Sequence, residues 1–159
     1  MKTETITVLT FDELSDDGKE RAIADYRHAG HGYFGIDDGI TSLKEFAGHF
    51  GVKIKDYEIG TCRGSFVTHD AENRHFRGMK LKQFNRDNMP TGYYLDCDLW
   101  ITFYDVFKAS GDAKAAFEAA IDKWIRGMVA DMEYQESDEA IAEMLSFNDY
   151  EFLESGKRW

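Results

Sequence analysis

The stretch that decides the fold runs from Asp112 to Tyr134 and reads DAKAAFEAAIDKWIRGMVADMEY. Its large apolar residues recur every three or four positions, which places them on one stripe of an α-helix. They are Phe117, Ile121, Trp124, Ile125, Met128, Val129 and Met132. A helix of this length extends about 35 Å at about 1.5 Å per residue. Other elements must cover the stripe, so the rest of the chain is expected to pack on this helix.

Three shorter helices are predicted from capping residues and apolar spacing. Ser15 is a good N-cap for a helix from about Asp16 to Ala29, in which Gly18 costs about 1 kcal/mol relative to alanine. A second helix begins at Asp37 or Asp38 and ends at His49, and Gly51 suits the position after its C-terminus. Ser137 caps a last helix that continues through Leu145.

Alternating or strongly apolar stretches predict five strands. These are Thr3 to Thr10, Val52 to Ile59, Cys62 to His69, Tyr93 to Tyr104 and Tyr150 to Leu153. Asp70 to Gly92 is interpreted as a loop that contains a short helix or an irregular hairpin. The order of elements predicts an α+β fold, with helices packed on one face of a mainly antiparallel sheet. No linker or repeat interrupts the chain, so a single domain of residues 1–159 is expected.

Composition and charge exclude several classes of function. The net charge of −11 argues against general affinity for nucleic acid or anionic lipid. No stretch approaches the roughly 20 apolar residues of a membrane span, and the first residues lack the pattern of a signal peptide. Cys62 and Cys97 fit reduced thiols better than a disulfide framework. We therefore expect a cytoplasmic protein that does not bind membranes.

Acidic residues dominate the C-terminal part of the chain, where no lysine or arginine occurs between Asp131 and Ser155. Carboxylates at this density can imitate nucleic-acid phosphates and occupy a basic groove. They can also serve as a solvated face that keeps the protein soluble. The candidate partner-binding residues of this acidic surface are Asp131, Glu133, Glu136, Asp138, Glu139 and Glu143.

A second candidate surface is a basic segment without acids between Asn73 and Arg86. It could contact a phosphate backbone or RNA bases, or it could pair with the acidic end of its own fold or of a second copy. Against the overall negative charge, direct binding of nucleic acid is not the expected role. The candidate residues of this basic and aromatic arm are Arg74, Arg77, Lys80, Lys82, Phe84 and Arg86.

Catalytic and metal-binding patterns are weak. Arg63 could lower the pKa of the Cys62 thiol, but His69 lies seven residues further on and no motif makes it the base of a dyad. His28 and His31 are separated by Gly30, which interrupts a helix, and no Cys-x-x-Cys pair completes a structural zinc site. No phosphate loop or dinucleotide fingerprint is present. We expect no enzyme activity, no metal and no cofactor.

The two ends of the chain resemble an uncharacterised family of small proteins encoded by tailed bacteriophages. The N-terminal similarity is carried by FDELSD (11–16), followed by Lys19 and Ala22. The C-terminal similarity is carried by SDEAI (137–141), NDYEF (148–152) and Gly156. These segments lie at both ends of the chain. The resemblance implies a mobile element acting inside an infected bacterium, and small acidic phage proteins of this kind include anti-CRISPR and other anti-defence inhibitors.

These observations lead to one main hypothesis and two alternatives. The main hypothesis is a phage-encoded acidic protein that inhibits a host defence protein or nucleic-acid-binding protein, such as a CRISPR effector subunit, by occupying a basic surface. One alternative is a small-molecule- or nucleotide-binding protein, or a minor enzyme, that uses residues 60–75. The other is an antitoxin-like protein that neutralises a partner toxin.

Overall fold

The computed structural model describes residues 6–62, 64–87 and 96–159. The chain forms two compact units. The terminal unit combines Met1–Tyr33 with Glu133–Trp159, and the central unit consists of Phe34–Met132. That residues 1–159 fold as a single domain stays a prediction.

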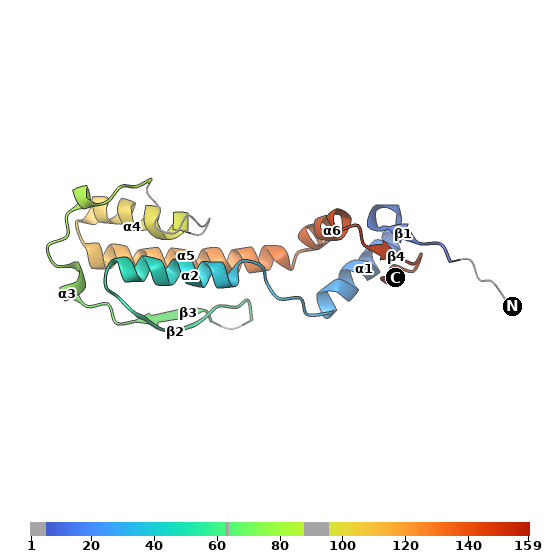
Figure 1. Ribbon diagram of the computed structural model, residues 1–159, viewed down its shortest axis with the longest axis horizontal. Coiled ribbons are helices and arrows are strands. Elements are labelled where there is room, and N and C mark those ends of the chain that lie inside the picture. Colours follow the sequence, from blue (N-terminus) through green and yellow to red (C-terminus); the bar gives the residue numbers. More distant parts are fainter. Residues whose placement is uncertain (1–5, 63, 88–95) are drawn as a thin grey trace. The chain divides into compact units, whose positions relative to one another are not determined.

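The central unit packs three helices and a β-hairpin together along the apolar stripe of the longest of these helices (Figure 1). The helices are α2 (Ile36–His49), α4 (Asp96–Ser110) and α5 (Ala113–Gln135), of which α5 continues past the boundary of the unit. The hairpin consists of β2 (Ile54–Glu58) and β3 (Phe66–His69). Two short helices follow it, α3 (Asn73–Phe76) and the 3-10 helix η2 (Leu81–Gln83).

Helix α5 confirms the predicted helix from Asp112 to Tyr134. Phe117, Ile121, Trp124 and Met128 are buried in the core of the central unit, whereas Glu118 lies on the exposed face. Alanines complete the buried stripe between the large side chains, which lets neighbouring helices approach closely. Its three- and four-residue spacing therefore identified both the helix and its buried side.

Aromatic rings contact one another where α2, α4 and α5 meet. The ring of Phe46 on α2 stacks on Phe117 of α5 with the centroids 5.4 Å apart, and it meets Phe103 of α4 edge-on at 6.1 Å. Phe50 contacts Phe103 at 4.7 Å and Phe84 at 6.1 Å. Burial of rings of this size dominates core energetics, at about 1.5–3 kcal/mol for each fully buried side chain.

The prediction of a strand from Tyr93 to Tyr104 is wrong. Residues 93–95 lie outside the described residues, and the chain from Asp96 to Ser110 is helix α4. Leu99, Trp100, Phe103 and Phe107 are buried and share one helical face. Aromatic and β-branched residues favour strands only weakly, and here packing on α2 and α5 outweighs that preference.

The β2–β3 hairpin confirms the second and third predicted strands with shorter bounds. The strands are antiparallel, with Tyr57 opposite Val67 and Glu58 opposite Phe66. The register shifts between Ile54 and Asp56, so the alternation of side chains changes phase there.

The terminal unit is built on two helices and one pair of short strands. The helices are α1 (Asp16–His28) and α6 (Asp138–Phe147), with the 3-10 helix η1 (Phe11–Glu13) preceding α1. The strands β1 (Leu9–Thr10) and β4 (Glu151–Phe152) are antiparallel. The predicted first strand is therefore shorter than expected, because residues 6–8 are not paired and residues 3–5 lie outside the described residues.

A small apolar core joins the elements of the terminal unit. Its buried members are Phe11, Leu14, Ala22, Ile141, Leu145 and Phe152. Both predicted N-caps are confirmed: the Ser15 hydroxyl accepts a hydrogen bond from the Gly18 amide, and the Ser137 hydroxyl accepts one from Ala140, each at 3.2 Å. The caps satisfy amides that the first turns of α1 and α6 would otherwise leave without partners.

Two glycines let the C-terminal turn lie directly on the first turn of α1. Gly156 has a φ of +82°, and a Cβ on it would sit 2.1 Å from the Gly18 carbonyl oxygen. A Cβ on Gly18 would meet the Glu154 carbonyl oxygen at 3.3 Å. Glycine at position 18 lowers the helix propensity of α1, but it leaves room for this close backbone approach.

The predicted fold class is confirmed as α+β. Helices form most of the described structure, and both pairs of strands are antiparallel. The strands form two separate two-stranded sheets, one in each unit.

Candidate partner-binding surface

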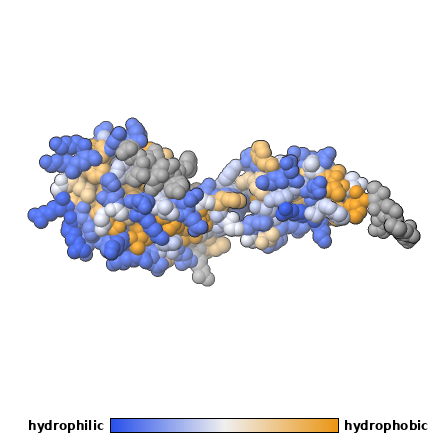
Figure 2. Space-filling view, viewed as in Figure 1, coloured by the Kyte–Doolittle hydropathy of each residue, from blue (hydrophilic) through white to orange (hydrophobic). Residues whose placement is uncertain are grey.

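Charge is distributed very unequally between the two units. The sequence of the terminal unit contains 15 acidic residues and six lysines or arginines, for a net charge of −9. The central unit contains 15 acidic residues and 13 lysines or arginines, for a net charge of −2. Hydrophilic side chains cover much of the visible face over α1 and α6 (Figure 2). The acidic residues are divided equally, so the shortage of lysine and arginine gives the terminal unit most of the protein's net negative charge.

All six predicted acidic residues are exposed, but they do not have equal roles. Asp131 belongs to the central unit, and the other five belong to the terminal unit. Glu133 lies in the last part of α5, Glu136 lies between α5 and α6, and the remaining three lie on α6.

Two of these carboxylates are used within the protein's own fold. Arg27 of α1 forms an ion pair with Asp138 and donates to the main-chain carbonyl of Glu136 at 3.1 Å. The Tyr33 hydroxyl donates to the Glu136 carboxylate. These contacts fix the junction of α5 and α6 against the end of α1. Sequence reasoning missed Arg27 and Tyr33, because no spacing rule links residues about 100 positions apart.

Three other carboxylates remain open to solvent. Glu133, Glu139 and Glu143 form no ion pair with any residue that the structure describes. The pKa of the Tyr134 hydroxyl is raised, first by the negative charge of Glu143, then by burial and by the charge of Glu139. Tyr134 therefore lies in a negative potential that Glu139 and Glu143 create.

Two exposed aromatic side chains accompany these carboxylates. Tyr134 is 50% exposed and Phe147, the last residue of α6, is 84% exposed. Sequence analysis missed both as surface residues. Glu139, Glu143 and Phe147 recur every four positions, so the helical period could have placed Phe147 on the acidic face.

The basic segment is only partly an exposed arm. Phe84 is half-buried, and its ring packs against the core at 5.1 Å from Phe103 and 5.8 Å from Trp100. The other five predicted residues are exposed. Arg74 lies 3.4 Å from the carboxylate of Glu72. Three of the six form no ion pair among the described residues. They are Arg77, Lys80 and Lys82.

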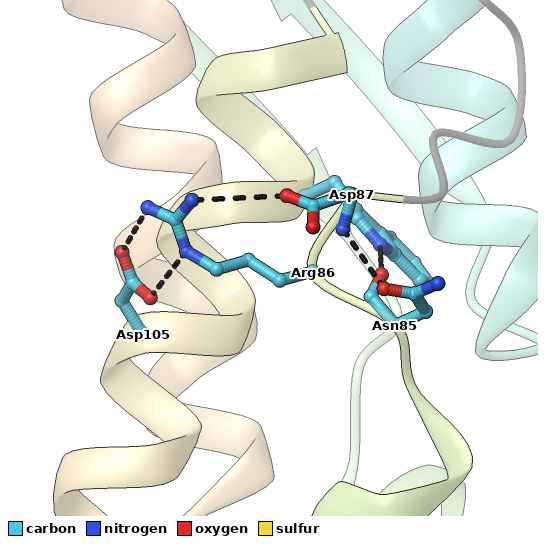
Figure 3. Close-up of polar contacts among 5 residues, drawn as sticks. Asn85, Arg86, Asp87 and Asp105 are labelled. Atoms are coloured by element: carbon cyan, nitrogen blue, oxygen red, sulfur yellow. Dashed lines mark hydrogen bonds and ion pairs between the residues drawn. The ribbon is translucent and has the colours of Figure 1, made fainter.

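Polar contacts hold the end of the basic segment on α4 (Figure 3). The Arg86 guanidinium donates two hydrogen bonds of 3.0 Å to the Asp105 carboxylate, and the Trp100 indole donates to the Asn85 carbonyl at 2.6 Å. The hydrogen bonds between Arg86 and Asp105 lower the pKa of the Asp105 carboxyl and raise the pKa of the Arg86 guanidinium. Arg86 is therefore bound to its own fold and is not a free cation for a partner.

Cys62 and His69, the two described residues considered for catalysis in the 60–75 segment, have separate contacts. Cys62 is exposed, Arg63 lies outside the described residues, and no contact joins Cys62 to His69. His69 Nδ1 accepts a hydrogen bond from the Ala71 amide at 3.3 Å, and its ring packs on Phe117. Burial is the main cause that lowers the pKa of His69. Its environment is that of a half-buried packing residue.

His31, one of the two histidines considered for zinc, has another contact, and so does His75 of the central unit. The His31 ring stacks on Tyr26 with the centroids 4.0 Å apart, and His75 Nδ1 accepts a hydrogen bond from the Glu72 amide at 2.9 Å. Across residues 6–62, 64–87 and 96–159, no group of three or more histidine, cysteine or acidic side chains is placed to hold a metal ion.

None of the described helices combines the length and apolar character needed to cross a membrane. Comparisons of this chain with protein-family models, curated proteins and solved structures find no match.

Proposed function

We propose that this protein is a binding protein that acts without chemistry, by docking its acidic terminal unit on a basic surface of a partner protein. The target class follows from the resemblance to tailed-phage proteins: a defence or nucleic-acid-binding protein of an infected bacterium, such as a CRISPR effector subunit. The observation that carries the proposal is the charge of −9 on the terminal unit, with exposed carboxylates that its own cations do not neutralise.

Unpaired surface carboxylates suit this role for a physical reason. A single-signed field steers a partner of opposite charge and raises the association rate, with a strong dependence on ionic strength. Screening by salt shortens the reach of this field to about 10 Å at 0.1 M. Binding through Glu139 and Glu143 should therefore weaken steeply as salt rises.

The central unit supports this role less well. Its net charge is −2, and two of its basic-segment cations, Arg74 and Arg86, lie beside carboxylates of the same unit. Its remaining exposed cations would repel a basic partner. An antitoxin-like role would use the same acidic surface and differs only in the target.

Affinity capture from a bacterial lysate with the full chain tests the proposal. The informative variant is Glu139→Gln with Glu143→Gln, because neither side chain forms an ion pair within the described structure. Glu136 is left unchanged because its carboxylate accepts the Tyr33 hydrogen bond. The matched control is Glu45→Gln with Glu58→Gln, which removes the same charge from exposed positions of the central unit.

We expect the full chain to capture a protein at low salt and to release it as salt rises. Glu139→Gln with Glu143→Gln should abolish this capture, whereas the control variant should retain it. Absence of any captured protein at low salt would contradict the proposal. Equal loss with the two double variants would also contradict it, because the terminal unit would then have no special role.

A further inference from the structure

The exposed face of α6 combines aromatic and acidic side chains in one continuous row. Glu139, Glu143 and Phe147 follow one another at one turn of the helix. Tyr134 lies within the electrostatic reach of Glu143 and Glu139. Phe147 is 84% exposed and makes no ring contact with any described residue. An exposed ring of this kind at the surface commonly anchors a protein interface.

Helix α6 is held rigidly from its opposite side. Ile141 and Leu145 are buried in the core of the terminal unit, and the Ser146 hydroxyl donates to the Asp12 carboxylate at 2.6 Å. The Ser137 hydroxyl caps the first turn, and the Asn148 side chain donates to the Met144 carbonyl at 2.7 Å after the last turn. Phe147 is therefore presented to solvent by a fixed helix, which reduces the entropy lost when a partner binds.

The chemistry of this row defines what would cover it. The two carboxylates have no ion-pair partners among the described residues, so cations of a partner would complement them. Apolar side chains beside those cations would complement the rings of Tyr134 and Phe147. Burying the rings alone against a polar groove would leave their apolar surface without complement. A protein segment that carries lysines or arginines beside an apolar stripe meets both requirements.

We propose that the surface formed by Tyr134 at the end of α5 and by Glu139, Glu143 and Phe147 of α6 is the docking surface, and that it takes a basic amphipathic helix of the partner protein. This inference rests on the proposed function and specifies the contact: Phe147 is the anchor, and the two glutamates pair with flanking cations. The rest of the acidic terminal unit supplies long-range attraction.

The test uses the full chain and two dye-labelled peptides followed by fluorescence anisotropy at low ionic strength. The first peptide consists of lysine and leucine, with leucines at helical spacing. The second has every leucine replaced by serine, so its charge is the same. We expect the first to bind at least about tenfold more tightly, which is about 1.4 kcal/mol.

Variants identify the surface that binds. Phe147→Ala should weaken binding of the lysine–leucine peptide about tenfold and leave the lysine–serine peptide unchanged, because truncation of a buried anchor ring costs more than 1 kcal/mol. Trp159→Ala removes another exposed ring of the same unit and should change neither. Glu139→Gln with Glu143→Gln should weaken both peptides more than Glu20→Gln with Glu154→Gln, a pair of exposed carboxylates elsewhere in the unit. Thermal melting of each variant reports whether it is folded.

The outcomes separate this inference from the proposed function. Equal affinity for both peptides, unaffected by Phe147→Ala, overturns the α6 surface and leaves acidic docking standing. Failure of both peptides to bind contradicts acidic docking itself. Sedimentation at increasing protein concentration covers a third occupant: self-association that Phe147→Ala abolishes would assign this face to a second copy and overturn the inference.

Discussion

Replacement of Gly156 by alanine tests the close backbone approach that holds the C-terminal turn on α1. The added Cβ would lie 2.1 Å from the Gly18 carbonyl oxygen, 3.0 Å from its carbon and 3.1 Å from its Cα. These are backbone atoms, so no side chain can rotate away to make room. Either the turn or the first turn of α1 must move.

The expected cost has two parts. The φ of +82° is unfavourable for an L-residue with a Cβ, by about 1–2 kcal/mol. Forcing a methyl group into a packed site adds about 1–3 kcal/mol. Gly156→Ala should therefore destabilise the terminal unit by about 2–5 kcal/mol, a large share of the roughly 5–15 kcal/mol that stabilises a typical protein.

Gly30→Ala is the matched control. Gly30 belongs to the same unit and has a φ of +67°, but nothing lies within 4 Å of the position of its Cβ. It should show only the backbone part, about 1–2 kcal/mol. Denaturant unfolding followed by circular dichroism gives both free energies of unfolding. Equal destabilisation by the two variants would refute the reasoning, because the contact with Gly18 would then cost nothing.

Three further predictions concern single side chains. Because burial lowers the pKa of His69, the unfolded chain binds a proton more readily than the folded chain. The free energy of unfolding should fall as pH drops from about 7 to about 5. His69→Asn should reduce this pH dependence in denaturant titrations. An unchanged pH dependence would mean that other titrating groups cause it. Trp124→Phe should destabilise less than Trp100→Phe, because Trp124 Nε1 has no hydrogen-bond partner among the described residues whereas the Trp100 indole donates to Asn85; thermal melts showing the opposite order would contradict this. Ser137→Ala removes the N-cap of α6 and should cost about 1 kcal/mol, measured as faster amide hydrogen exchange in the first turn of α6; unchanged exchange there would show that the cap is not needed.

Local rules predicted much of the helical structure. The stripe on α5 follows from spacing alone, and the helices after Ser15 and Ser137 follow from their capping hydroxyls. Such features depend on residues within one or two turns of each other. Sequence carries this information directly because the interactions are local.

The region that became α4 shows where local rules fail. Trp100 and Phe103 belong to residue types that favour strands, and the predicted strand ends at Tyr104. Phe107 completes the buried face of the helix but lies beyond the predicted strand. Contact with Phe46 and Phe50 decides the conformation, and these residues lie about 50 positions away.

Sequence predicted where the acidic residues of the candidate surface lie, but not which of them are paired or which aromatic residues are exposed. Counting acids located Glu139 and Glu143 correctly on an exposed face, yet it gave Asp138 the same weight although Arg27 pairs with it. An exposed Phe147 and a half-buried Phe84 cannot be told apart by residue type. Their surroundings depend on which distant elements pack nearby.

The most direct test of the central idea, that the protein works through the acidic face of its terminal unit, is an amide chemical-shift map. The full chain labelled with nitrogen-15 is titrated with the lysine–leucine peptide or with a captured partner. We predict that the changes concentrate between Glu133 and Phe147. Changes concentrated in residues 60–75 or 74–86 would contradict the account and move the functional site to the central unit.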